Sequence, residues 1–252
     1  FLGQHLLLPD ADPEHRQQKH IAPTSARAAR RPGIVALRPD EKPRTMQTEN
    51  QLPNSPAPAW RPPGASITTR RVHGKSSVAC RPSIVGGAIP REIMCESGLE
   101  KKVGHVLLTH PQVADLREQP PSVVWTDAAG NRHRHIFDFL ATLKDSRKLA
   151  VAVKPKDRAE RYRLTEVLAM IATQLPRGFA DGVLLITDAD LPRDLVHNST
   201  LLHHARRAPD AELDAAMLSL AGAGAVTTIG ALVRASGRGG DAFRALNRLI
   251  AK

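Results

Sequence analysis

The chain has 252 residues and a formal net charge of +11 at pH 7, from 36 lysines and arginines against 25 aspartates and glutamates. This surplus favours a polyanionic partner, and nucleic acid over a membrane surface, because cations that neutralise phosphates release counterions. No apolar run approaches the ~20 residues of a membrane-spanning helix, and residues 1–9 lack the basic start and long apolar stretch of a signal peptide. The two cysteines, Cys80 and Cys95, have no zinc-site spacing and form no disulfide framework, so we expect reduced thiols and a cytoplasmic protein.

Residues 1–88 are predicted to be a largely disordered, basic arm. Prolines recur throughout this segment, and no periodic apolar pattern lasts longer than one helical turn. Such a segment cannot bury enough surface to offset its ordering entropy. Its basic residues include Arg70, Arg71 and Lys75, which we predict to follow DNA phosphates. A solvated linker without a specific role is the alternative.

Residues 89–207 are predicted to fold as one α/β domain. Apolar residues recur at helical spacing in some segments, and short apolar or alternating runs bounded by turn residues indicate strands in others. The predicted helices are 92–108, 157–174 and 195–207, and the predicted strands are 122–126, 133–143, 148–154 and 182–187. We expect the first three strands to form an antiparallel meander, entered through a connector at 113–121. The order of elements predicts a mixed sheet with helices on both faces.

Residues 208–252 are predicted to form a separate unit of three short helices, at 211–221, 227–235 and 241–252. A glycine-rich turn precedes the basic last helix, which suits a helix-turn-helix or winged-helix-like module. The predicted DNA contacts of this unit are Arg238, Arg244 and Arg248. A small helical cap on the preceding domain is the alternative.

Three polar residues of the central domain form a pattern suited to phosphodiester hydrolysis. Glu100 lies on the first predicted helix, Asp138 on a strand and Lys154 at the end of the next strand. The two carboxylates, with the backbone carbonyl of Val153, would hold magnesium or manganese, which would polarise a phosphoryl oxygen and help to generate hydroxide. Lys154 would orient water or stabilise developing charge. An ordinary ion pair between Asp138 and Lys154 is the alternative.

Strand periodicity predicts which of these side chains share a face, because successive side chains alternate. Phe137 and Phe139 would both point into the core, on the face opposite to Asp138. On the following strand, Lys154 would share its face with Ala152. The predicted site therefore includes the position of Ala152.

Four short motifs in this region resemble those of a known family. They are Glu-Ser-Gly-Leu-Glu (96–100), Leu-Arg-Glu-Gln-Pro (116–120), His-Ile-Phe-Asp-Phe (135–139) and Ala-Val-Ala-Val-Lys-Pro (150–155). Together they resemble the TnsA-like transposon endonucleases of the restriction-endonuclease-like superfamily, with its PD-(D/E)xK signature. The resemblance implies a restriction-endonuclease-like fold in which Glu100, Asp138 and Lys154 are catalytic. It also implies double-stranded transposon-end DNA as substrate, with a transposase subunit and an ATPase regulator as partners.

The chain departs from this signature at Ala152, where the family usually has Glu, Asp or Gln. Losing that polar group would cost on the order of several kcal/mol of transition-state stabilisation. Glu96, one predicted helical turn before Glu100, is a candidate to supply the missing oxygen. Two main interpretations follow: a metal-dependent DNA endonuclease, or a catalytically inactive DNA-binding and assembly subunit with a nuclease-like fold. A transcriptional regulator acting through residues 208–252 is a third.

Overall fold

The computed structural model describes residues 6–7, 62–69, 81–224 and 228–250. Most of the predicted arm, with Arg70, Arg71 and Lys75, lies outside the described residues. The strands are β1 (Leu6–Leu7), β2 (Ser83–Gly86), β3 (Arg91–Met94), β4 (Val113–Glu118), β5 (Val123–Thr126), β6 (Arg132–His135), β7 (Phe139–Leu143), β8 (Lys148–Val153) and β9 (Gly182–Ile186). The helices are α1 (Gly98–Thr109), α2 (Lys156–Arg161), α3 (Leu164–Thr173), the 3-10 helix η1 (Asp188–Asp190), α4 (Arg193–Arg206), α5 (Ala211–Gly222), α6 (Ile229–Ser236) and α7 (Gly239–Ile250).

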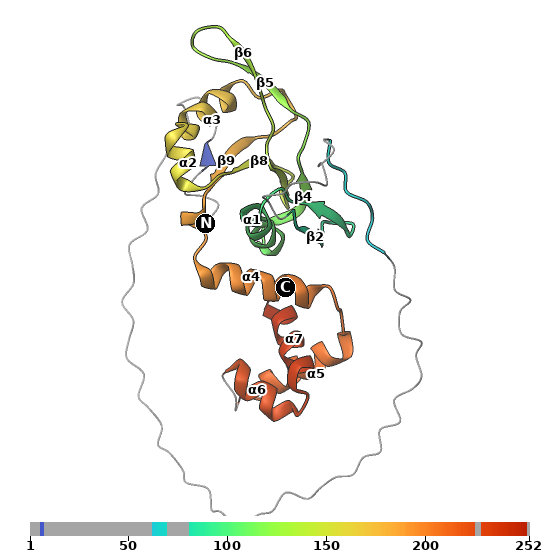
Figure 1. Cartoon of the computed structure of the whole chain (residues 1–252). Helices are drawn as coiled ribbons and strands as arrows, with labels where there is room; N and C mark the ends of the chain where they lie inside the picture. Colours follow the sequence, from blue (N-terminus) through green and yellow to red (C-terminus); the bar gives the residue numbers. More distant parts are fainter. Residues whose placement is uncertain (1–5, 8–61, 70–80, 225–227, 251–252) are drawn as a thin grey trace, which may run out of the picture. The chain divides into compact units, whose positions relative to one another are not determined.

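The main sheet is mixed, with five described strands in the order β1-β9-β8-β7-β4 (Figure 1). β8 and β9 are parallel, whereas the other three neighbouring pairs are antiparallel. The parallel pair is joined through α2 and α3, because parallel neighbours need a long crossover. The mixed sheet predicted from the order of elements is therefore confirmed.

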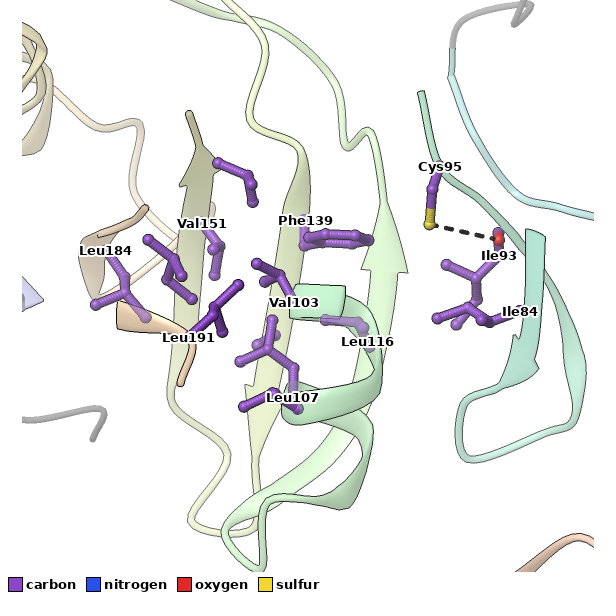
Figure 2. Packing of buried hydrophobic residues seen from close by; sticks show 14 residues of the cluster. Ile84, Ile93, Cys95, Val103, Leu107, Leu116, Phe139, Val151, Leu184 and Leu191 are labelled. Atoms are coloured by element: carbon purple, nitrogen blue, oxygen red, sulfur yellow. Dashed lines mark hydrogen bonds between the residues drawn. The ribbon is translucent and has the colours of Figure 1, made fainter. Parts of the chain in front are cut away.

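Helices pack against both faces of this sheet. On one face, Val103 and Leu107 of α1 meet Leu116, Phe139 and Val151 of three strands (Figure 2). Partly buried residues of α4 join the same cluster. On the other face, α2 and α3 cover a second cluster, whose buried members are Val123, Trp125, Phe137, Ala150, Ala152, Ala159, Leu168, Ile171, Ala172, Val183 and Leu185. The predicted site lies where β7 begins and the antiparallel β8 ends.

The two antiparallel pairings of the predicted meander are present, but its middle strand, 133–143, is broken into β6 and β7. β7 lies between β8 and β4, whereas β5 pairs with β6 in a separate hairpin. Residues 113–118, expected to be a connector, form the edge strand β4. This strand was missed because three of its six residues are charged, including the fully buried Glu118, and leave no alternating apolar pattern.

The first helix also begins later than predicted. Residues 91–94 form β3, which pairs with β2, so the folded domain starts before the predicted boundary at residue 89. Ser97 then caps the N-terminus of α1. The single helix predicted over 157–174 is interrupted where Arg163 adopts a left-handed conformation, with φ of 48°. Each difference arises from a local turn or cap that apolar periodicity does not detect.

The last three helices match the three predicted after residue 208. They share a small apolar core, whose buried members are Leu213, Met217, Leu232, Ala242, Ala245 and Leu246. Thr228 caps α6 by accepting the N–H of Ala231, and Gly237 ends that helix in a left-handed conformation. None of the helices in the described part of the chain is long and apolar enough to cross a membrane.

Candidate active site

Glu100 is held at the start of α1 by a reciprocal cap. The Ser97 hydroxyl donates to Glu100 Oε1 at 2.8 Å and accepts the Glu100 N–H at 3.1 Å. Glu100 Oε2 accepts the backbone N–H of Glu96 at 2.6 Å. These bonds satisfy free N–H groups at the helix start and fix a carboxylate that is only 8% exposed. Glu96 itself precedes the helix, so its predicted place one helical turn before Glu100 is wrong.

Asp138 lies in the short break between β6 and β7, and backbone hydrogen bonds anchor it on two sides. Its N–H donates to the Val151 carbonyl at 2.9 Å, and its Oδ2 accepts the Val153 N–H at 2.6 Å. Its own carbonyl accepts the N–H of Gln119 at 2.9 Å. Within the described residues, Oδ1 makes no hydrogen bond. One oxygen of a firmly placed carboxylate is therefore left for a ligand.

The break at Asp138 changes the predicted faces of the strand. Phe137 and Phe139 are both fully buried, but they lie in opposite clusters, Phe137 beneath α3 and Phe139 beneath α1. The prediction that they share a face is therefore wrong. Ala152, only 3% exposed, belongs to the same cluster as Phe137. Its methyl group contributes to the apolar core where a polar group was expected.

The structure brings Glu100, Asp138 and Lys154 within electrostatic range of one another. Burial, and after it the Glu100 carboxylate, raise the pKa of Asp138 to about 7, although the Val153 N–H and Lys154 act in the opposite direction. Burial likewise raises the pKa of Glu100, while the Glu96 N–H, the Ser97 hydroxyl and Lys154 lower it. Lys154 is itself exposed at the end of β8. Two buried carboxylates beside an exposed lysine favour a proton or a cation between them.

The donor set suits a hard cation that keeps water and substrate ligands. Magnesium is usually bound by one or two carboxylates together with waters and phosphate oxygens. Glu100, Asp138 and the Val153 carbonyl meet this modest requirement. In the described ranges, no group of three or more histidines, cysteines, aspartates or glutamates is arranged to hold a metal ion. The residues present therefore fit magnesium or manganese bound with a phosphate, and not a cage made by the protein alone.

Residues 62–69 form a strap that is hydrogen-bonded to Glu118 and Gln119, a feature that was not predicted from the sequence. Glu118 Oε1 accepts the Ser66 hydroxyl and, at 3.0 Å, the Ile67 N–H. The Gln119 carbonyl accepts the Thr69 hydroxyl at 2.8 Å, and its side chain accepts the Thr68 hydroxyl at 2.9 Å. The only available signal was the Glu-Gln-Pro motif at 118–120.

Gln119 links this strap to the site. Its φ of 38° is left-handed, which costs a residue with a side chain about 1–2 kcal/mol. In this conformation its N–H reaches the Asp138 carbonyl while its own carbonyl faces the strap. Strain of this kind persists where the surrounding contacts fix the backbone. Gln119 therefore links Asp138 to the strap, because its N–H binds the Asp138 carbonyl and its own carbonyl accepts the Thr69 hydroxyl.

The predicted DNA contacts of the last helices have different environments. Arg238 is exposed in the turn before α7, and Arg244 is exposed and paired with Asp241. Arg248 is buried, with Nε donating to Asp214 at 2.8 Å and Nη1 to the Ala208 carbonyl at 2.8 Å. Arg248 therefore holds the helical unit together, which removes it from the predicted DNA surface.

A mixed sheet flanked by helices, with a glutamate on the first helix and an aspartate and a lysine at adjoining strand ends, defines a nuclease-like α/β domain. Residues 110–176 match the family model described as TnsA-like endonuclease N terminal. This match confirms the predicted resemblance to the TnsA-like endonucleases for this segment of the chain. It includes Asp138 and Lys154, and begins directly after the helix that carries Glu100. No curated protein matches the chain.

Proposed function

We propose that the protein is a metal-dependent endonuclease that hydrolyses phosphodiester bonds in transposon-end DNA. The observation that carries the proposal is the gathering of buried Glu100 and Asp138 beside exposed Lys154, next to and within a TnsA-like endonuclease segment. The net charge of +11 supports a polyanionic substrate. Arg70 and Arg71 directly follow the strap in the sequence and Lys75 comes soon after, and we assign these three residues to the DNA backbone.

Each residue of the site has a distinct part in this proposal. Glu100, Asp138 and the Val153 carbonyl would hold Mg²⁺ or Mn²⁺, which supplies Lewis-acid activation of the phosphate and acidifies water. The backbone bonds to Asp138 keep its carboxylate in place before substrate arrives. Lys154 projects from the end of β8, where its ammonium would orient the attacking water or neutralise developing charge on the phosphate.

Glu96 is the proposed substitute for the polar group that Ala152 lacks. Its charge raises the pKa values of both Glu100 and Asp138, so it lies within electrostatic range of the two carboxylates. We expect Glu96→Ala to lower the nicking rate by at least about tenfold, equal to about 1.4 kcal/mol. An unchanged rate would remove Glu96 from the site.

A catalytically inactive DNA-binding and assembly subunit is the second candidate function. It is favoured by the apolar environment of Ala152 and by the capping bonds that engage both oxygens of Glu100. In either case we propose double-stranded DNA, a transposase subunit and an ATPase regulator as partners, in the cytoplasm. A transcriptional regulator remains the weakest candidate, since Arg248 is buried.

The deciding experiment is nicking of supercoiled plasmid with magnesium or manganese, by the wild type, Asp138→Ala and Lys154→Ala. Asp145→Ala is a matched control, because this exposed carboxylate lies at the other end of β7 and pairs with Arg147. We expect nicking by the wild type and the control, and its loss in the two site variants. DNA binding without nicking, even after a transposase partner is added, would establish the inactive subunit.

A further inference from the structure

The β5–β6 hairpin presents a cationic face that takes no part in the site described above. Val124 pairs with Arg134, and Thr126 pairs with Arg132. Directly opposed residues share a face of an antiparallel ribbon, so these four side chains lie on one side. Both arginines are exposed, and Val124 beside them is 39% exposed. The hairpin is the ribbon labelled β5 and β6 in Figure 1.

The opposite face fixes the hairpin to the domain. Val123 and Trp125 are buried in the cluster beneath α3, and His133 stacks on Trp125 with ring centroids 4.8 Å apart. The Gln174 side chain donates to the Thr126 carbonyl and accepts its N–H, both at 2.9 Å. These contacts leave the arginine face directed away from the core.

The two arginines of this face are not neutralised by the protein. Within the described part of the chain, neither Arg132 nor Arg134 makes an ion pair or a hydrogen bond. The acidic residue of the hairpin turn, Asp127, instead pairs with His133 at 2.8 Å, on the other face. Two residues along a strand separate the arginines by about 7 Å. The two positive charges repel each other at this distance, and a bound anion such as a phosphate would offset the repulsion.

The hairpin is continuous with the candidate active site. It is the excursion of the chain between Gln119 and Asp138, and the 2.9 Å hydrogen bond from the Gln119 N–H to the Asp138 carbonyl closes its base. Arg134 precedes Asp138 by four residues, which span at most about 14 Å. A duplex whose scissile phosphate lies at Asp138 would therefore pass within reach of this face.

We propose that the outward face of the β5–β6 hairpin, with Arg132 and Arg134, binds the phosphate backbone of duplex DNA beside the scissile bond. The inference rests on the proposed function for its substrate. It adds a docking surface that holds the duplex by charge, with the exposed Val124 as an apolar contact for the sugars. Because phosphates carry no base identity, the contact fixes the position of the duplex and not its sequence.

The test is the salt dependence of duplex binding by the full chain in EDTA, where cleavage is blocked. Each phosphate contact contributes about 0.9 to the slope of log K against log salt. We expect Arg132→Ala/Arg134→Ala to reduce the magnitude of this slope by about 2. The control Lys144→Ala/Arg147→Ala removes the same charge from the exposed turn at the far end of β7, and we expect it to leave the slope unchanged.

Two further comparisons keep the outcome unambiguous. Arg132→Lys/Arg134→Lys should retain the wild-type slope, and thermal unfolding should show that all variants are folded. Equal slopes for the wild type and the hairpin variant would overturn the docking surface without affecting the proposal that the protein binds DNA. A protein would then be the remaining candidate partner for this face. Absence of duplex binding by the wild type would overturn the proposed function together with the docking surface.

Discussion

The fold stabilises the ionised form of Asp138 poorly. Its pKa is raised to about 7, first by burial and then by Glu100, so the native state retains a proton between about pH 4 and 7 that the unfolded chain has lost. The conformational stability of the metal-free protein should therefore fall as pH rises through this range. Residues selected for activity commonly impose such a cost.

We predict that Asp138→Asn stabilises the metal-free protein at pH 8. The neutral amide can still accept the Val153 N–H but carries no charge to bury, so the gain should be on the order of 2–4 kcal/mol, shrinking towards pH 4. Urea unfolding in EDTA at both pH values measures it. Asp145→Asn, an exposed change, should have little effect. A variant less stable than the wild type at pH 8 would contradict the assigned environment.

The buried Glu118 supports the strap, and we predict that Glu118→Ala destabilises the fold. The change leaves the Ser66 hydroxyl and the Ile67 N–H without their acceptor, at a cost of about 1–3 kcal/mol in the free energy of unfolding. Chemical denaturation measures the loss. Glu160→Ala, at an exposed i,i+4 pair with Lys156, should cost less than about 0.5 kcal/mol. Equal effects of the two variants would show that the strap contributes nothing.

The sequence singled out the candidate carboxylates, Glu100 and Asp138, but it did not reveal their surroundings. Glu100, Asp138 and Lys154 stood out because polar residues interrupt apolar segments within a recognisable order of motifs. Three features were invisible: the opposite faces of Phe137 and Phe139, the place of Glu96 before the helix, and the buried charge of Glu118. Each depends on a backbone irregularity or a distant hydrogen bond, which local periodicity does not encode.

At the scale of elements, the interface of α1 with α4 contains a buried histidine pair. The rings of His105 and His203 lie 4.9 Å apart, and both side chains are at most 5% exposed. The burial of His203 is not evident from the sequence, because the low overall hydrophobicity of α4 hides its inner face. Neither ring nitrogen of His105 has a hydrogen-bond partner within the described residues. Burial lowers the pKa of each histidine to about 4.

This pair predicts an acid-labile helix interface. The unfolded chain takes up protons near pH 6.5 whereas the native pair resists them until about pH 4, so stability should fall as pH drops through that window. His105→Leu removes one of these groups and should reduce the difference in melting temperature between pH 7.5 and 5. His197→Leu, elsewhere on α4, is the control. An unchanged pH difference in the His105 variant would contradict the prediction.

Elements with complete local signals were predicted well, and those shaped by tertiary contacts were not. The last three helices have caps, glycine stops and apolar stripes in the sequence, and their positions agree with the structure. β4 and the break before α3 have none of these signals. The edge strand exists because β7 offers it a partner, and the left-handed backbone of Arg163 separates α2 from α3.

At the scale of the whole molecule, we predict that magnesium stabilises the wild type but not Asp138→Ala. A ligand that binds the native state adds about 2.7 kcal/mol at a hundredfold excess over its Kd. Thermal unfolding in magnesium and in EDTA measures the difference, and requires no DNA or partner protein. Asp181→Ala, away from the site, should respond as the wild type does. Equal stabilisation of the Asp138 variant would mean that the ion binds elsewhere.

The hydrogen bond between Gln119 and Asp138 has a consequence for fidelity. Through this bond, Asp138 is connected to three chain segments: the strap that leads to Arg70, the hairpin with its two arginines, and the sheet. A displacement of any of these segments would shift the backbone carbonyl of Asp138. If duplex DNA binds the strap side and the hairpin, its binding would also position Asp138 more firmly. The protein without bound target DNA would then cleave slowly, and cleavage of unintended DNA would be rare.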